Sequence, residues 1–184
     1  NEVSNVLSHS ESKALFISDR LLGKVSEQCR KQIHLIIDIN TLKPIFVDGQ
    51  PVEPTAMGSQ SAELTTPGPD SLAALIYTSG TTGKATGVTL SHRNFTNNIA
   101  GAYNFHAITP EDVFLSVLPL AHTYELSIGL IYPFAGGACV AYMTKKPTPS
   151  ALKEAMPIVR PTTMLTVPLI IEKVYKGVVI PKVR

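Results

Sequence analysis

The segment from residue 72 to residue 84 joins an apolar run, LAALIY, to a polar loop, TSGTTGK. Every side chain of the loop is small, hydroxylic or cationic, and none is acidic. Gly80 and Gly83 permit positive φ angles, which let backbone N–H groups approach a ligand closely. Successive N–H groups in such a turn form a nest that binds anions, and Lys84 adds a positive charge. We therefore expect this loop to bind phosphate.

Two common phosphate-binding patterns do not fit the loop. A Walker loop requires a glycine five residues before Gly83 and a Ser or Thr after Lys84, but these positions hold Thr78 and Ala85. The dinucleotide pattern G-x-G-x-x-G fits Gly80 and Gly83 but also requires glycine at position 78. The plain alternative is a Gly/Ser/Thr surface turn between two strands.

Three stretches resemble one enzyme family. YTSGTTGKATGVTLSHRN (77–94) resembles the signature loop of the adenylate-forming enzymes, which include acyl- and aryl-CoA synthetases, luciferases and peptide-synthetase adenylation domains. LPLAHTYEL (118–126) resembles the next family motif in its long-chain acyl-CoA synthetase form, and residues 1–18 resemble the preceding segment. The resemblance implies a fatty acid–CoA ligase that forms an acyl-adenylate from ATP and then an acyl-CoA from coenzyme A.

The resemblance also implies roles for individual residues. The β- and γ-phosphates of ATP would be bound, with Mg²⁺, by Thr78, Ser79, Gly80, Thr81, Thr82, Gly83 and Lys84. Thr82 would contact the magnesium ion. His122 would act as a catalytic residue at the acyl and adenylate pocket, whereas a histidine at a helix N-terminus is the plain alternative. Glu125 would lie at the acyl pocket or have a structural role.

The chain departs from the family pattern in ways that bear on activity. Thr86 stands where the family has a basic residue, and Ala85 stands where it usually has proline. Loss of a cation beside phosphate weakens charge-assisted hydrogen bonding. A later YGxTE-like segment is absent from the sequence. We expect a piece of a longer enzyme that is inactive alone; the alternatives are an acyl-AMP ligase, an aryl-CoA ligase, a non-catalytic acyl- or nucleotide-binding module, and a structural domain.

Composition limits the partners. The 184 residues are 44% hydrophobic and carry a net charge of +2 from scattered Lys and Arg, which does not indicate a nucleic-acid partner. Cys29 and Cys139 are far apart and outside any Cys/His cluster, so a zinc site is not expected. No apolar run reaches the ~18 residues that span a bilayer. We expect a cytoplasmic protein, and a fatty acid substrate is compatible with peripheral association with the inner membrane face.

Hydrophobic periodicity predicts alternating strands and helices. The expected strands are 13–18, 34–39, 72–79, 87–91, 112–119, 138–143 and 162–167. The expected helices are 2–9, 19–32 with Asp19 as N-cap, 91–107 capped by Ser91, 122–137, 148–159, and one opening at Pro168.

This alternation predicts an α/β fold, with a mostly parallel sheet and helices on both faces. The resemblance makes it part of the N-terminal domain of an adenylate-forming enzyme. We expect one structural domain made of an α/β unit at 1–40, a Pro-rich connection or hairpin at 41–71 turning at Asp48–Gly49, and an α/β unit at 72–184. Ligands of such sheets bind at the carboxyl ends of the strands, where loops 78–87, 119–123 and 165–168 lie.

Overall fold

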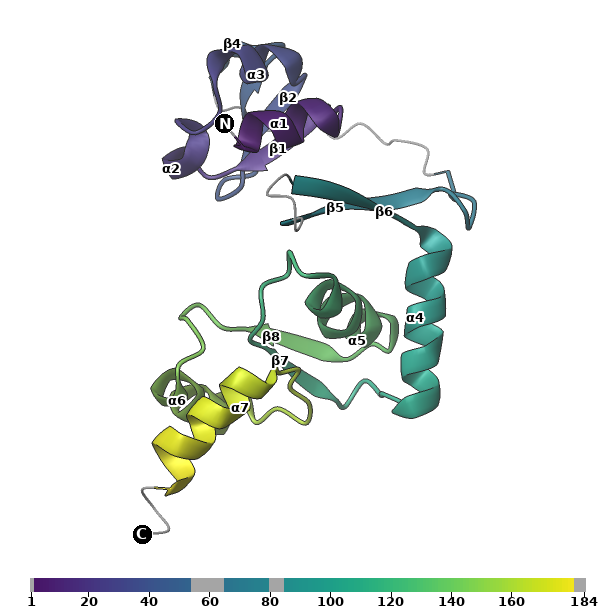
Figure 1. Ribbon diagram of the computed structural model, residues 1–184, viewed down its shortest axis with the longest axis vertical. Helices are drawn as coiled ribbons and strands as arrows, with labels where there is room; N and C mark the ends of the chain where they lie inside the picture. The colour runs from purple at the N-terminus through teal and green to yellow at the C-terminus, as the bar shows by residue number, and fades with distance from the viewer. Residues whose placement is uncertain (1, 54–64, 80–84, 181–184) are drawn as a thin grey trace. The chain divides into compact units, whose positions relative to one another are not determined.

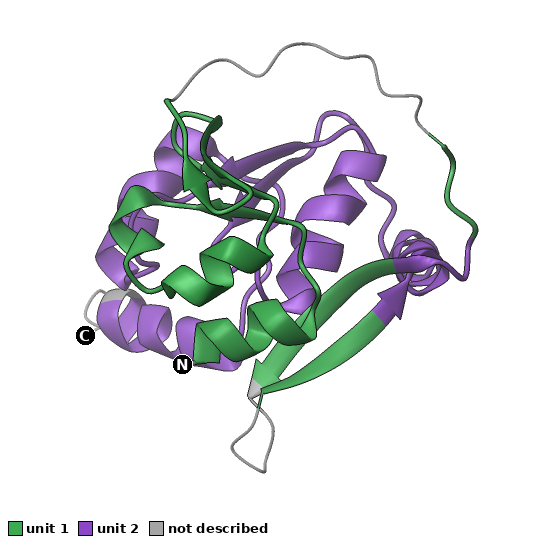
Figure 2. Cartoon of the chain, turned by 90° about the horizontal axis from the view of Figure 1, so that it is seen from above, with its two compact units in different colours: residues 1–68, 73–89 green, residues 69–72, 90–184 purple. Residues whose placement is uncertain are grey.

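The computed structural model describes residues 2–53, 65–79 and 85–180 (Figure 1). The chain divides into two compact units (Figure 2). The first comprises residues 1–68 and 73–89, and the second comprises residues 69–72 and 90–184. Each unit has its own sheet and its own buried residues, so each is described separately.

The first unit contains short helices beside a four-stranded sheet of order β1-β2-β3-β4. Its elements are α1 (Glu2–His9), β1 (Ala14–Ile17), α2 (Asp19–Leu22), α3 (Glu27–Gln32), β2 (Leu35–Asp38), β3 (Lys43–Val47) and β4 (Gln50–Pro51). β1 and β2 are parallel, whereas β3 is antiparallel to both β2 and β4. The turn between β3 and β4 has φ angles of 49° at Asp48 and 77° at Gly49, which suit a two-residue hairpin.

The single helix predicted over 19–32 is wrong. The segment forms two helices, and the N-cap of α2 is Ser18 rather than Asp19. The second helix starts anew because the Ser26 side chain accepts a hydrogen bond from the Cys29 N–H at 3.3 Å. A serine that caps a helix in this way gives the backbone a start signal within what reads as one periodic stretch.

Two further strands, β5 (Leu72–Ser79) and β6 (Ala85–Ser91), form a two-stranded sheet and flank residues 80–84. β6 ends at Ser91, which caps α4 (His92–Phe105) as predicted. The Ser91 side chain accepts a hydrogen bond from the Asn94 N–H at 3.3 Å, and the Asn94 side chain accepts one from the Ser91 N–H at 2.8 Å. This reciprocal capping box fixes where the helix begins.

The second unit is built around two parallel strands, β7 (Val113–Ser116) and β8 (Cys139–Tyr142), which lie side by side (Figure 1). Its other elements after α4 are the π-helix η1 (Glu125–Ile131), α5 (Tyr132–Ala135), α6 (Pro149–Val159), α7 (Pro168–Val174) and the π-helix η2 (Tyr175–Val179). Successive strand residues face opposite sides. Phe114 packs with α4 and α5 residues, whereas Leu115 packs with α6 and α7 residues. The predicted α/β fold with helices on both faces is therefore confirmed.

Two expected elements of this unit differ in the structure. The predicted helix over 122–137 is wound as a π-helix in its centre, where the Tyr132 N–H donates to the Ser127 carbonyl five residues earlier, and Pro133 lacks the N–H that would continue an α-helix. The strand predicted at 162–167 is reduced to one parallel bridge between Thr163 and Phe114. There the Thr162 hydroxyl accepts from the Val113 N–H at 3.0 Å, so a side chain replaces a backbone ladder bond.

Candidate functional site

The strands that flank the predicted phosphate loop are described, but most of the loop is not. Thr78, which is exposed, and Ser79 close β5. The other predicted phosphate-binding residues, and the predicted magnesium contact Thr82, lie outside the described residues: Gly80, Thr81, Thr82, Gly83 and Lys84. Their predicted roles therefore stay predictions.

The strand leading into the loop is held from two sides within the first unit. The Tyr77 hydroxyl lies 2.5 Å from Nδ1 of His9 in α1, and the two rings meet edge to face with centroids 5.7 Å apart. Across the sheet, a Cβ at Gly87 would lie 3.0 Å from Leu75 Cδ1 and 3.4 Å from the Tyr77 ring. Because Gly87 has no side chain, β6 can lie close against the Tyr77 ring.

The start of α4 anchors the segment that precedes β5. Nε and an Nη of Arg93 donate to the two carboxylate oxygens of Asp70 at 2.7 and 2.9 Å. The backbone N–H groups of His92 and Arg93 donate to the carbonyls of Ser71 and Pro69. The Arg93 guanidinium holds the pKa of Asp70 below its usual value. These contacts give His92 and Arg93 a structural role in the second unit.

His122 lies in the second unit, directly before the helical segment that contains η1. Its backbone N–H donates to the Pro119 carbonyl at 3.0 Å, and its carbonyl accepts from the Leu126 N–H at 2.9 Å. The backbone of His122 thus closes the turn after β7, and the residue is exposed.

Glu125, one turn after His122, is fully buried with 0% exposure. Its Oε1 accepts a 2.5 Å hydrogen bond from the hydroxyl of Ser116, the last residue of β7. Its Oε2 is buried without a partner among the described residues. Burial raises the pKa of this carboxyl group, and the Ser116 hydrogen bond lowers it by less. Because an uncompensated buried charge is costly, this environment favours the neutral acid.

A glycine makes room for that carboxyl group. A Cβ atom at Gly129 would lie 2.6 Å from Cδ of Glu125 and 2.7 and 2.8 Å from its two oxygens. Real Cβ atoms do not approach other heavy atoms so closely. The Glu125 side chain therefore lies directly against the backbone of the next helical turn.

A cavity of about 530 Å³ opens where β7 and β8 end. It is lined mostly by apolar side chains, including Leu118, Leu120, Met143 and Ile170, with Ser116, Tyr142 and Lys145 as the side chains that carry polar groups. Its volume lies within the range of small-molecule sites, and its place at the carboxyl ends of parallel strands is where such folds bind ligands. This cavity could hold an apolar chain.

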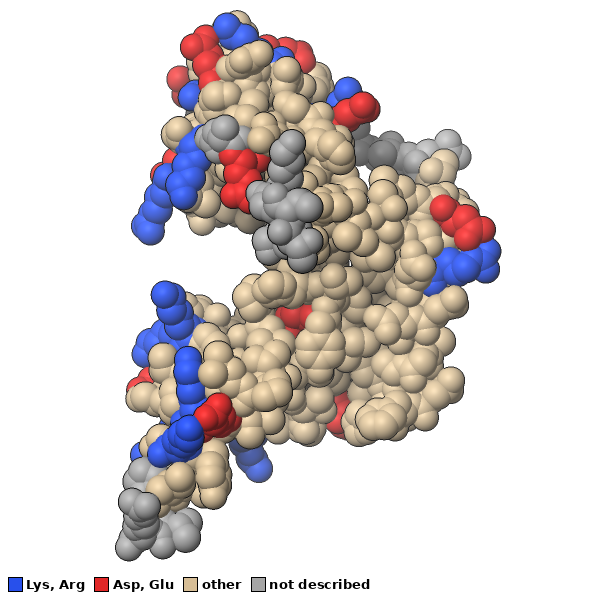
Figure 3. Space-filling model, viewed as in Figure 1, with Lys and Arg blue, Asp and Glu red and all other residues tan. Residues whose placement is uncertain are grey.

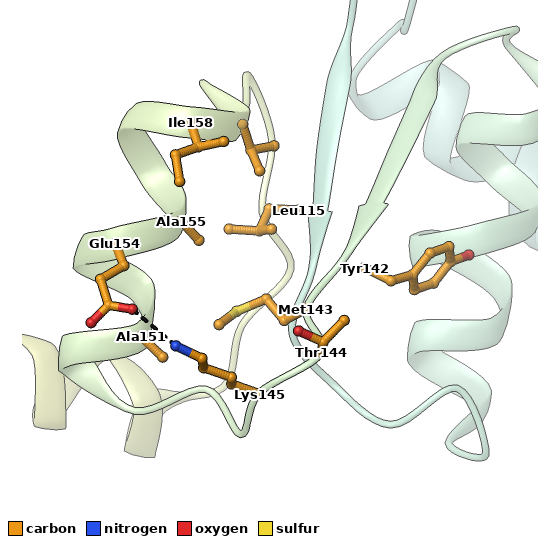
Figure 4. Close-up of a pocket in the computed structure, with 10 residues that line it drawn as sticks. Leu115, Tyr142, Met143, Thr144, Lys145, Ala151, Glu154, Ala155 and Ile158 are labelled. Atoms are coloured by element: carbon orange, nitrogen blue, oxygen red, sulfur yellow. Dashed lines mark hydrogen bonds and ion pairs between the residues drawn. The ribbon is translucent and has the colours of Figure 1, made fainter.

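A second cavity of about 250 Å³ lies between α6 and the end of β8 (Figure 4). Ala151, Ala155 and Ile158 of α6 line one side of it, and Leu115 also lines it. Lys145 Nζ reaches Glu154 Oε2 at 3.2 Å (Figure 4). Since Lys145 also lines the larger cavity, this ion pair lies beside both.

The geometry brings together residues that the sequence did not link. His122 and Glu125 were predicted from their motif, and loops 119–123 and 165–168 were predicted at the ligand-binding edge of the sheet. Pro119, Leu120 and Val167 of these loops line the larger cavity, whereas Ser116 was not predicted. The signal for Ser116 was a single serine within the apolar run VFLSVL. Thr78 and Ser79 belong to the first unit, and His122 and Glu125 to the second.

Metal ligands and charged patches are the other features of the described residues that could mark a site. In the described parts of the chain, no group of three or more His, Cys, Asp or Glu side chains could hold a metal ion. On the face shown in Figure 3, acidic side chains lie among the basic ones. None of the described helices is long and apolar enough to cross a bilayer.

Comparison with known proteins decides the family. The AMP-binding enzyme family matches residues 1–181. The chain belongs to the AMP-binding enzyme family. Fatty acyl-CoA synthetase A of Dictyostelium discoideum is 29% identical over 188 aligned positions, which cover 95% of the chain and 28% of that protein. The peroxisomal long chain acyl-CoA synthetase 7 of Arabidopsis thaliana is 36% identical over 112 positions, which cover 61% of the chain and 16% of that protein.

Solved structures agree on the fold. ATP-bound MatB from Rhodopseudomonas palustris superposes with a TM-score of 0.75 at 23% identity, over 95% of the chain and 33% of that structure. The o-succinylbenzoate coenzyme A synthetase of Bacillus subtilis, in complex with ATP and magnesium, gives a TM-score of 0.70 at 23% identity. The match covers 95% of the chain and 33% of that structure. The chain thus has the fold of part of an adenylate-forming enzyme and spans a third or less of these relatives.

Proposed function

We propose that the protein containing this chain is an ATP-dependent fatty acid–CoA ligase. The observation that carries the proposal is the apolar cavity of about 530 Å³ at the carboxyl ends of β7 and β8, beside the turn that presents His122. The similarity to fatty acyl-CoA and long-chain acyl-CoA synthetases supports an aliphatic acid as the substrate. A mostly apolar lining suits a chain of methylene groups better than a polar acid.

The proposed reaction has two steps. A fatty acid carboxylate oxygen attacks the α-phosphorus of ATP, and pyrophosphate leaves, which gives the acyl-adenylate. The sulfur of coenzyme A then attacks the acyl carbonyl carbon, AMP leaves, and the thiol proton passes to solvent or a base. Positioning and charge stabilisation carry such transfers.

We assign the residue roles accordingly. Thr78 to Lys84 bind the β- and γ-phosphates, and Thr82 contacts the magnesium that accompanies ATP. His122 meets the acyl and adenylate groups from the turn after β7. The 184 residues alone hold only part of the site, so we propose that they are inactive without the rest of the protein. We also propose that the protein acts in the cytoplasm, with its membrane contact to be tested by fractionation.

Pyrophosphate release by the full-length protein tests the proposal. The assay supplies ATP, Mg²⁺ and fatty acids of increasing chain length, with and without coenzyme A. Release that depends on a fatty acid, together with a thioester product, is the expected result. Adenylation without thioester formation would make the protein an acyl-AMP ligase. Absence of release with any carboxylic acid from a folded protein would overturn the enzyme assignment.

A further inference from the structure

The buried pair of Ser116 and Glu125 has no place in the proposed chemistry. We propose that Glu125 is a positioning residue that, through Ser116, holds residues 117–124 as the wall of the larger cavity and the support of His122. The expected effect on fatty acid binding rests on the proposed function. The ordering of residues 117–124 by Glu125 does not, and it can be tested without any substrate.

The contact closes a loop between two elements. Ser116 ends β7 and is 6% exposed, Glu125 opens η1 and is 0% exposed, and their side chains meet at 2.5 Å. Leu118, Pro119 and Leu120, which lie between them in sequence, line the larger cavity. The hydrogen bond therefore joins both ends of the segment that forms this wall.

Glu125 itself does not line either cavity, whereas Ser116 lines the larger one. The burial of Glu125 leaves neither of its carboxyl oxygens accessible to a substrate. Its effect on a ligand must therefore pass through Ser116 and through the backbone of residues 117–124. A buried, hydrogen-bonded polar group specifies one arrangement of its neighbours, since breaking it leaves a desolvated atom without a partner.

Gly129 leaves the space that the carboxyl group occupies. Since a Cβ at position 129 would lie 2.6 Å from Cδ of Glu125, any larger residue there must push the carboxyl group away from Ser116. The Glu125 side chain and a side chain at position 129 are thus alternative occupants of one volume. This exclusion provides a test that a general packing role would not pass.

The surroundings suit an uncharged carboxyl group. Ser116 of β7 offers a neutral hydroxyl. On β8, burial raises the pKa of the Tyr142 phenol most, and negative charge on Glu125 raises it further, so the two groups are close enough to interact. No cation pairs with Glu125 in the described residues. The amide oxygen of Gln can accept the same hydrogen bond from Ser116, so Glu125→Gln should keep the segment in place.

The activity arm uses the full-length protein. Glu125→Ala is expected to raise KM for the fatty acid about tenfold, as loss of a buried hydrogen bond implies, while KM for ATP stays within about twofold. Glu125→Gln should restore most of the affinity for fatty acid. Glu27→Ala, which removes an exposed carboxylate of α3, is the matched control. Equal changes in both KM values would contradict a role at the cavity wall.

The structural arm uses hydrogen exchange of the same full-length variants without substrate. Glu125→Ala and Gly129→Ala should each speed exchange of the amides in residues 117–126. The double variant should exchange no faster than Glu125→Ala, because the new methyl group fills the vacated space. Unchanged exchange in Glu125→Ala, or an added effect in the double variant, would overturn the inference. An inactive wild type with these exchange results would instead reject only the proposed function.

Discussion

The carboxyl group of Glu125 lies against the backbone of Gly129, so that a Cβ at position 129 would come within 2.6 Å of its Cδ. The two residues are one helical turn apart and share one small volume. This relationship explains how a π-helix can bury a complete carboxyl group beside the end of β7. It also makes the position of the Glu125 carboxyl group sensitive to any side chain introduced at position 129.

Removal of the Ser116 hydroxyl should destabilise the second unit. Ser116→Ala leaves Glu125 Oε1 buried without its donor, and a buried group without a partner costs about 1–3 kcal/mol. Urea unfolding or exchange of the β7 amides would measure the loss. Ser71→Ala, at an exposed position, is the control and should change stability by less than about 0.5 kcal/mol. Equal effects of the two substitutions would argue against the hydrogen bond.

The pH dependence of stability should change in Glu125→Gln. The folded pKa of Glu125 is raised above its ordinary value of 4.5, chiefly by burial, so the folded state holds the proton more tightly than the unfolded state. This contribution is present at low pH and is lost as pH rises from about 4.5 through the raised folded pKa. Gln cannot titrate, so the difference in unfolding free energy between wild type and variant should vary across that window.

Other groups do not obscure that difference. The pKa of Asp112 is lowered first by the Thr109 N–H and then by the Thr162 hydroxyl. Its contribution is therefore lost as pH falls, with the opposite sign to Glu125. Since Asp112 is present in both proteins, its effect cancels. Parallel stability curves for wild type and Glu125→Gln would show that Glu125 has the same pKa in both states.

Two glycines of the first unit should respond oppositely to alanine. Gly49 has φ +77°, and a Cβ there would lie 2.9 Å from Lys31 Cα, so Gly49→Ala should cost about 1–3 kcal/mol. Gly23 has φ −63° and no atom within 4 Å of a built Cβ. Gly23→Ala should be neutral or stabilise by up to about 1 kcal/mol. Denaturant midpoints of the two variants would show whether backbone conformation determines the difference.

A cation at position 86 should strengthen nucleotide binding in the full-length protein. Thr86 is exposed on β6, just after the predicted phosphate loop. If position 86 limits phosphate binding, Thr86→Lys should tighten ATP binding about tenfold, since charge-assisted bonds to phosphate are strong. Thr89→Lys adds the same charge farther along β6 and is the control. Titration calorimetry would measure the affinity for ATP. Unchanged affinity in both variants would indicate that Lys84 already supplies the positive charge beside the phosphates.

Local signals were enough to predict the start of α4. Ser91 caps α4 as predicted because its partner, Asn94, is three residues away. The prediction failed where a distant or competing group intervened. The Thr162 hydroxyl, far along the chain, accepts from the Val113 N–H, and the strand expected at 162–167 is reduced to one bridge. Ser26 likewise splits the helix expected over 19–32 by capping Cys29.

The amino-acid sequence by itself determined the family, the alternation of strands and helices, and the candidate residues His122 and Glu125, since motifs and periodicity are local properties of the chain. Only the tertiary structure decided what Glu125 does. Its burial, its bond to Ser116 and its dependence on Gly129 arise when β7 packs against η1. Desolvation depends on every neighbour in space, so no spacing along the chain could reveal that this carboxyl group is shielded from water.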